Sequence, residues 1–306
     1  MTDDLSRRDT LRIGAATAGL GVIGGLSGCS SIPFLGGGSS AYDSWLPEPG
    51  VIVEDTDHYS FSYSDAKAIR NNEDNFDEDV FETYESTEDS FPLEQMNVDF
   101  DEVNSQISVK GSNGVITGKF KKDEVGSELE DDDFEEDGDH EGYTLYTKQE
   151  SQGVAVKKNE AVYAQMGFFS GGDNTPTDVL EALIDTKKGN EERYAKAEED
   201  FKTLIGKLGS GTLVYGGTQE EPDETNADAG RFEGAVARGS KLTVNGETSK
   251  AKRIVVFNSK DDIDMNDVED WTDSDAFDDY DNVNSSKNGR AVVVTAKIDT
   301  DDYTWG

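Results

Sequence analysis

The sequence predicts an α+β fold with largely antiparallel sheets and helices on one face. Short runs rich in Val, Ile, Tyr and Thr recur along the chain and are separated by Gly, Asn and Asp, which is typical of strands joined by turns. Two longer helical patterns lie together in the middle of the chain. Because strands cluster and do not alternate regularly with helices, an antiparallel arrangement is favoured over a parallel doubly wound one.

The first half contains a hairpin signal and one amphipathic helix. "SQISVKG" and "NGVITGKF" predict two strands that turn at Ser112-Asn113-Gly114. Val125 and Leu129 share one face of the helix expected within residues 121–134. The expected elements are strands at residues 51–54 and 59–63, a helix at 64–70, a loosely ordered acidic stretch at 71–90, the hairpin and helix just named, and strands at 142–148, 153–158 and 161–166.

The second half opens with the two central helices. Thr175, Pro176 and Asp178 are a helix start with a capping residue, and Gly209 is expected to end the second helix. The expected elements are helices from residue 176 and at 191–208, a strand at 211–217, an acidic loop, a hairpin within 231–246 that turns near Gly239, a strand at 252–258, a helix at 261–271 and a strand at 290–299.

A repeated order of elements is visible at this level. Residues 114–158 are expected to run strand, helix, strand, strand, and residues 252–299 run in a similar order. We therefore expect two β-α-β-β pseudo-repeats around the central helical pair.

The charge of the chain restricts where it can work. It has 66 acidic and 28 basic residues, a net charge of −38 and a pI near 4.1. At molar salt the screening length falls to about 3 Å, so such a surface suits concentrated brine. Disorder is the alternative for so charged a chain, but 14 Phe, 11 Tyr and 3 Trp favour a folded body. With no basic patch in the sequence, nucleic acid is not expected as a partner.

The N-terminus has the features of an export signal. Arg7 and Arg8 form a twin-arginine pair, followed by Leu11. Residues 13–26 are uncharged and rich in Gly and Ala. This segment is too short to span a bilayer, which takes about 20 apolar residues. A signal peptide is therefore expected. Cys29, the only cysteine, follows directly after it.

Leu26-Ser27-Gly28-Cys29 resembles a lipobox, in which cleavage precedes the cysteine. Together with the acidity, residues 6–29 resemble the Tat-exported lipoproteins of halophilic archaea. The resemblance implies a lipid on Cys29 and a place on the outer face of the cytoplasmic membrane. It divides the chain into a signal peptide (1–28), a lipidated and flexible tether (29–44) and an extracytoplasmic α+β domain (45–306). Plain secretory cleavage with a free thiol is the alternative.

Few residues of the body indicate chemistry. His58 and His140 are the only histidines, and no hydrolase, zinc-protease or nucleotide-binding motif occurs. Asp133, Glu135 and Asp137 imitate the first half of a calcium loop, but Thr144 stands where the closing Glu belongs; an acidic turn is the expectation. Asn284-Ser285-Ser286 is a glycosylation sequon in a polar stretch between elements. No cofactor and no metal are expected.

These observations favour a binding or structural module of the cell envelope over an enzyme. The expected partners are the membrane, through the lipid on Cys29, and an envelope protein. Two alternatives stay open: a solute-binding receptor of a transporter and an extracytoplasmic hydrolase.

Overall fold

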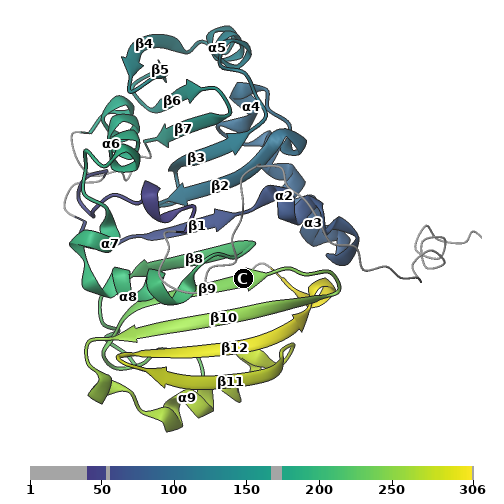
Figure 1. Cartoon of the computed structure of the whole chain (residues 1–306), viewed down its shortest axis with the longest axis vertical. Coiled ribbons are helices and arrows are strands. Elements are labelled where there is room, and N and C mark those ends of the chain that lie inside the picture. Colours follow the sequence, from purple (N-terminus) through teal and green to yellow (C-terminus); the bar gives the residue numbers. More distant parts are fainter. Residues whose placement is uncertain (1–39, 53–55, 167–173, 305–306) are drawn as a thin grey trace, which may run out of the picture. The chain divides into compact units, whose positions relative to one another are not determined.

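The computed structural model describes residues 40–52, 56–166 and 174–304. Within them, twelve strands form one antiparallel sheet in the order β11-β12-β10-β9-β8-β1-β2-β3-β7-β6-β5-β4 (Figure 1). Every neighbouring pair is antiparallel. The α+β fold class is therefore confirmed, with one continuous sheet.

The strands are β1 (Ser60–Ser64), β2 (Val103–Val109), β3 (Asn113–Gly118), β4 (Glu135–His140), β5 (Tyr143–Lys148), β6 (Gln152–Lys157), β7 (Glu160–Gln165), β8 (Leu213–Thr218), β9 (Ala235–Thr243), β10 (Thr248–Phe257), β11 (Asp281–Asn288) and β12 (Ala291–Asp299). The helices are α2 (Ala66–Arg70), α3 (Glu78–Glu85), α4 (Leu93–Met96), α5 (Lys122–Asp131), α6 (Pro176–Lys188), α7 (Tyr194–Ala197), α8 (Glu199–Leu208) and α9 (Met265–Thr272).

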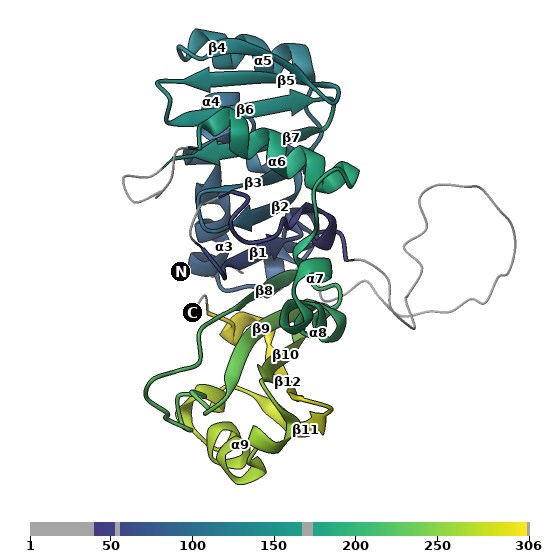
Figure 2. The same ribbon diagram turned by 90° about the vertical axis from the view of Figure 1, so that its left-hand side faces the viewer.

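Helices cover both faces of the sheet, not one as expected. On the α6/α8 face, Leu183 and Leu204 pack against strand residues such as Val115 and Ile254, and Figure 2 shows α6, α7 and α8 in a row across the strands. On the opposite α5/α9 face, α5 packs in one apolar cluster and α9 in another. The strands require this because successive residues, such as Val115 and Ile116, are buried on opposite faces.

The two halves of the sheet repeat one connectivity. β1-β2-β3 and β8-β9-β10 are each a three-stranded meander. A helix, α5 or α9, then leads to the outermost strand, β4 or β11, and the chain returns to pair with the third strand of its meander. In the first half, β5, β6 and β7 connect the outermost strand back to the meander. In the second half, β12 alone makes this connection. The expected pseudo-repeats thus correspond to a repeat in the sheet topology.

Residues 71–90, expected to be loosely ordered, form helices. α3 begins after Asp77, whose carboxylate accepts a hydrogen bond from the backbone N–H of Asp79 at 3.0 Å. Phe81 and Tyr84 are buried on one side of α3. The acidic residues occupy its exposed side. The acidic composition of this stretch therefore did not indicate that it forms an amphipathic helix.

The turn expected near Gly239 is instead the middle of β9. A Cβ at this position would lie 2.8 Å from Leu208 Cδ1 and 2.9 Å from the backbone oxygen of Tyr215. The glycine therefore permits close approach of α8 to the sheet. The chain turns after Thr243, where Gly246 has a φ of 72°.

Three smaller expectations also change. Val51 and Ile52 lie in a bend and not in a strand, while part of that expected strand falls outside the described residues. The helix expected over 191–208 divides into α7 and α8, because Glu198 has extended backbone angles. The acidic turn after α5 and the polar stretch after α9 contain the edge strands β4 and β11.

Candidate functional site

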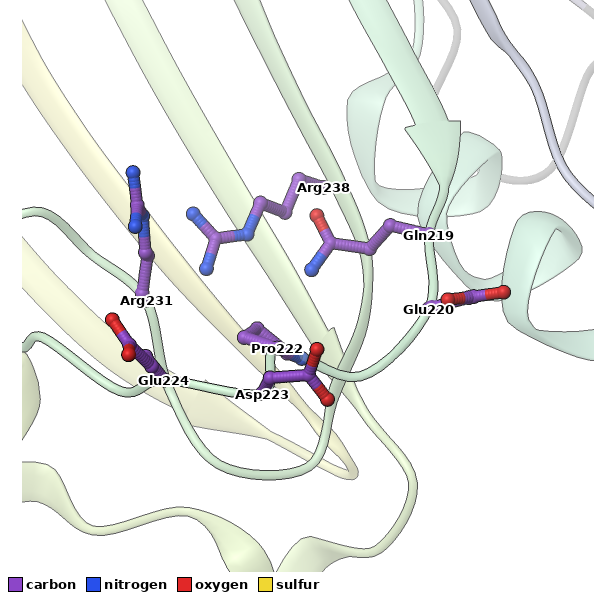
Figure 3. Close-up of a pocket in the computed structure, with 7 residues that line it drawn as sticks. All are labelled: Gln219, Glu220, Pro222, Asp223, Glu224, Arg231 and Arg238. Carbon is purple, nitrogen blue, oxygen red and sulfur yellow. The ribbon is translucent and has the colours of Figure 1, made fainter.

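A pocket of about 500 Å³ lies beside the end of β8, the middle of β9 and the loop that joins these strands. Figure 3 shows the side chains that line it. They are Gln219, Glu220, Pro222, Asp223, Glu224, Arg231 and Arg238. Two arginines in one pocket are unusual in a chain with so large an excess of acid.

Arg238 is the unusual group of this pocket. The register places it opposite Gly217 and Val255, so it projects from the α5/α9 face of the sheet. Its Nε and Nη2 atoms are buried, and among the described residues nothing accepts a hydrogen bond from them. Burial, and then the nearby Arg231, lower the pKa of Arg238. Buried N–H donors of a cationic side chain that lack an acceptor are costly for a folded protein.

The second arginine comes from the β8–β9 loop. The backbone of Arg231 pairs with that of Asn226 through two hydrogen bonds of 2.8 Å. Glu221 accepts hydrogen bonds from the backbone of Gly234 at 2.8 Å and from Asn258 Nδ2 at 3.2 Å. These contacts hold the loop to the sheet, and Arg231 is thereby held beside Arg238 (Figure 3).

The remaining polar side chains do not neutralise the two arginines. Gln219 donates from Nε2 to the backbone oxygen of Ala235 at 3.2 Å. Glu220, Asp223 and Glu224 are exposed, and none of the ion pairs among the described residues involves them. The pocket thus has a floor formed by the half-buried Arg238 and a rim of exposed side chains, which are Arg231 and the three acidic residues.

Tyr215 adds an aromatic surface near this floor. Among the described residues, Tyr215 is the one large hydrophobic side chain that is exposed, with 52% of its surface accessible to solvent. Tyr215 is opposite Ser240 in the β8–β9 register, and Arg238 lies two residues along β9. Such diagonal neighbours are about 7–8 Å apart on one face of a sheet, within reach of long side chains.

This arrangement can bind an anion. The free N–H groups of a guanidinium fit carboxylate, phosphate or sulfate oxygens, and Tyr215 can pack against an adjoining ring. Neither His58 nor His140 lines the pocket. The geometry therefore indicates a site that can bind an anion.

Most of the residues that carry the sequence-based expectations are outside the described residues. These are Arg7, Arg8, Leu11, Leu26, Ser27, Gly28 and Cys29. Asn284 is described and exposed, but it is in β11 and not in a loop between elements.

The three acidic residues that imitate the first half of a calcium loop lie at the β4 edge of the sheet. Asp133 is in the turn before β4, while Glu135 and Asp137 are exposed within it. Asp137 accepts a hydrogen bond from Thr177 Oγ1 at 2.6 Å. Among the described residues, no three His, Cys, Asp or Glu side chains converge as metal ligands would.

The two histidines have different surroundings. His58 is exposed in the segment before β1 and not within a strand. His140, at the end of β4, lies between two carboxylates of α6: its Nε2 is 3.0 Å from Asp185 Oδ1 and its Nδ1 is 3.5 Å from Glu181 Oε1. His140 therefore joins β4 to α6.

The sequence does not single out the cationic side chains. Arg238 belongs to a strand pattern, and nothing local distinguishes it from a solvated arginine. The expectation that no basic patch exists is also wrong, because the register of β9, β10 and β12 gathers lysines that are far apart in sequence. The alternation of Lys250 and Lys252 was the available signal.

No protein-family model matches the chain, and no curated protein matches it. It is similar in structure to "crystal form III of TP0453", at 12% identity over 83% of this chain and 94% of that chain, with a TM-score of 0.49. Crystal form I of TP0453 gives 13% identity over 83% and 94%, with a TM-score of 0.46. These likenesses concern the fold alone. Within the described residues, no helix has the length and apolar character needed to cross a bilayer.

Proposed function

We propose that the protein is a Tat-exported lipoprotein of a halophile, held on the outer face of the membrane by a lipid on Cys29. Its body is a binding module for a small anionic ligand, which Arg231 and Arg238 hold. The single observation that carries the ligand class is the half-buried guanidinium of Arg238, whose Nε and Nη2 atoms have no acceptor among the described residues and which lines an open pocket.

The acidic rim supports selective binding. In dilute buffer it repels every anion, but at molar salt this repulsion is screened within about 3 Å. A ligand that makes direct hydrogen bonds to both arginines then gains from short-range contacts that salt screens much less. The pocket therefore suits an anion with fixed geometry, such as a carboxylate or phosphate carried on a ring.

Titration calorimetry tests the ligand class. The full-length protein, in molar salt, is titrated with phosphate, sulfate, citrate and glucuronate. We expect at least one to bind, and Arg238→Met to weaken that binding about tenfold or more, since charged hydrogen bonds contribute about 1.5–3 kcal/mol each. Arg253→Met is the matched control: Arg253 stacks on Phe277 on the same face but does not line the pocket. Equal affinity of all three proteins would refute the proposal.

The anchor is tested separately. Cys29→Ser should move the protein from the membrane fraction to the culture medium, measured by fractionation and immunoblotting. A variant that stays on the membrane after the signal is removed would contradict the lipid assignment.

The halophilic character has its own measurement. Circular dichroism during dialysis from molar to millimolar salt should show loss of structure, because the net charge of −38 is no longer screened. An unchanged spectrum would contradict adaptation to brine.

A solute-binding receptor of a transporter is the second candidate, since a pocket that retains a small anion is what such a receptor needs. A co-transcribed permease and ATPase would favour it over a structural module.

A further inference from the structure

A second cationic region lies on the opposite side of the sheet, on the α6/α8 face. Lys241 of β9 is directly opposite Lys252 of β10, and Lys250 of β10 is directly opposite Lys297 of β12. These four side chains share a face with Ile254, which packs beneath α8. We call them the lysine grid.

The lysine grid has no carboxylate partners among the described residues. Lys241 Nζ donates to the backbone oxygen of Ser210 at 2.8 Å, and Lys252 Nζ donates to that of Lys207 at 3.0 Å. Both contacts are at the carboxyl end of α8, where cations are favourable. Lys250 and Lys297 are exposed, and no such structural role explains them.

Like charges directly opposite one another destabilise a sheet. Burial, and then Lys252, lower the pKa of Lys241 to about 8, and burial and Lys207 lower the pKa of Lys252. The neighbouring acids do not relieve this repulsion: Asp281 is opposite Lys297 in the β11–β12 register yet forms no ion pair with it.

Two hollows meet at the lysine grid. One, of about 420 Å³, is lined by all four lysines together with Thr243, Thr295, Asn282 and Asn284. The other, of about 390 Å³, shares Lys250 and Lys297 with it and continues toward Asn245 and Glu247. The site is therefore elongated and extends past a single pair of charges.

We propose that the lysine grid binds an acidic polysaccharide, in an extended conformation along these two hollows. Its cations are spaced by about 5 Å between strands and about 7 Å along a strand. The repeat of a pyranose polymer with one carboxylate or sulfate per sugar is comparable, whereas the charges of polyphosphate are closer together. Asn282, Asn284, Thr243 and Thr295 offer hydrogen-bonding groups to sugar hydroxyls.

The glycosylation sequon bears on the same site. Asn284 lines the larger hollow, so a glycan attached to it would occupy the space of the ligand. The two uses of this position exclude one another, and the protein that binds polysaccharide is unmodified at Asn284.

Binding to immobilised polygalacturonate, measured by surface plasmon resonance in molar salt with the full-length protein, tests the inference. Lys250→Gln/Lys297→Gln should weaken binding about tenfold or more. Lys67→Gln/Lys119→Gln removes the same charge from exposed lysines elsewhere and should leave it unchanged. Arg238→Met should also leave it unchanged, which separates this site from the small-anion pocket.

Three results would overturn the inference. The first is that both double variants lose the same affinity for polygalacturonate. The second is that the protein binds uncharged dextran as tightly as polygalacturonate. The third is that it binds polyphosphate, single-stranded DNA or anionic vesicles but does not bind polygalacturonate. Circular dichroism of each double variant at the same salt verifies that it is folded.

Discussion

The two halves of the sheet share a connectivity but differ in how many of their basic residues form ion pairs. Among the described residues, every ion pair except one joins side chains that precede β8. The exception is Arg290 with Asp200. In the half that begins at β8, Arg238 and the lysine grid have no carboxylate partner. A chain with 66 acidic residues does not lack acids to pair with them.

The difference separates structural cations from cations available to a ligand. In the first half, Lys157 bonds to Glu160 and to the hydroxyl of Tyr143, so its charge is used within the fold. In the second half, the cations line hollows on both faces of the sheet. Unpaired cations cost stability, and bound anions would recover that cost.

The largest expected effect is at the ion pair that joins the second half to α8. Arg290 pairs with Asp200 and also donates to the backbone oxygen of Phe257 at 3.0 Å and to Thr203 Oγ1 at 3.3 Å. Arg290→Met should lower the free energy of unfolding by about 2 kcal/mol, less than for a fully buried pair because both side chains are partly exposed. Urea unfolding in molar salt measures it. If the pair is responsible, adding Asp200→Asn costs little more.

Arg238→Met should not lower the free energy of unfolding, in contrast to Arg290→Met. Removing a buried cation without an acceptor leaves the free energy of unfolding unchanged or raises it by up to about 1 kcal/mol. The same urea experiment, without ligand, measures it. A loss comparable to that of Arg290→Met would mean that Arg238 is a structural cation, and the contrast between the halves would fail.

The pH dependence of stability reports on the lysine grid. The pKa of Lys241 is about 8 in the folded protein and ordinarily about 10.4 in an unfolded chain. The folded state therefore binds fewer protons between these values, so Lys241 should make the stability rise as the pH increases above about 8. The rise should be small because the side chain is partly exposed.

Thermal unfolding between pH 7 and pH 9 detects this rise, and Lys241→Met should reduce it, since burial also lowers the pKa of Lys252. The range stops there because burial raises the pKa of Tyr42 and Tyr63 to about 12. At higher pH these tyrosines ionise first in the unfolded chain and lower the stability. The same rise in Lys241→Met would assign it to other groups.

The smallest effect is expected for an exposed ion pair of the first half. Lys202 Nζ lies 2.9 Å from Glu199 Oε2, with both side chains more than half exposed. Lys202→Gln should change the free energy of unfolding by less than about 0.5 kcal/mol at molar salt. A larger loss would show that exposed pairs also stabilise this protein.

Local signals in the sequence predicted much of the fold. The β2–β3 hairpin, α5 and the strands β5, β6, β7, β8 and β12 follow from apolar patterns and turn residues. α6 begins at Thr175 with the predicted cap, which accepts a hydrogen bond from the backbone of Asp178. The edge strands β4 and β11 could not be predicted, because exposed residues such as Glu135 and Asn284 show no apolar alternation.

The candidate sites depend on register. A shift of β9 by one residue would move Arg238 to the α6/α8 face and Lys241 to the α5/α9 face. No short segment of sequence encodes that choice, because it depends on α8 packing over Gly239 and on the apolar residues of β10 and β12 on both faces.

By itself, the sequence determined the acidity of the protein, its α+β class, and the basis for expecting export and a lipid anchor. These properties are local or additive, since each depends on composition or on a short run of residues. Only the tertiary structure decided which cations meet and which find a carboxylate. Lys241 meets Lys252, and Lys250 meets Lys297, only through sheet pairing, and such contacts exist only after distant strands have come together in one register.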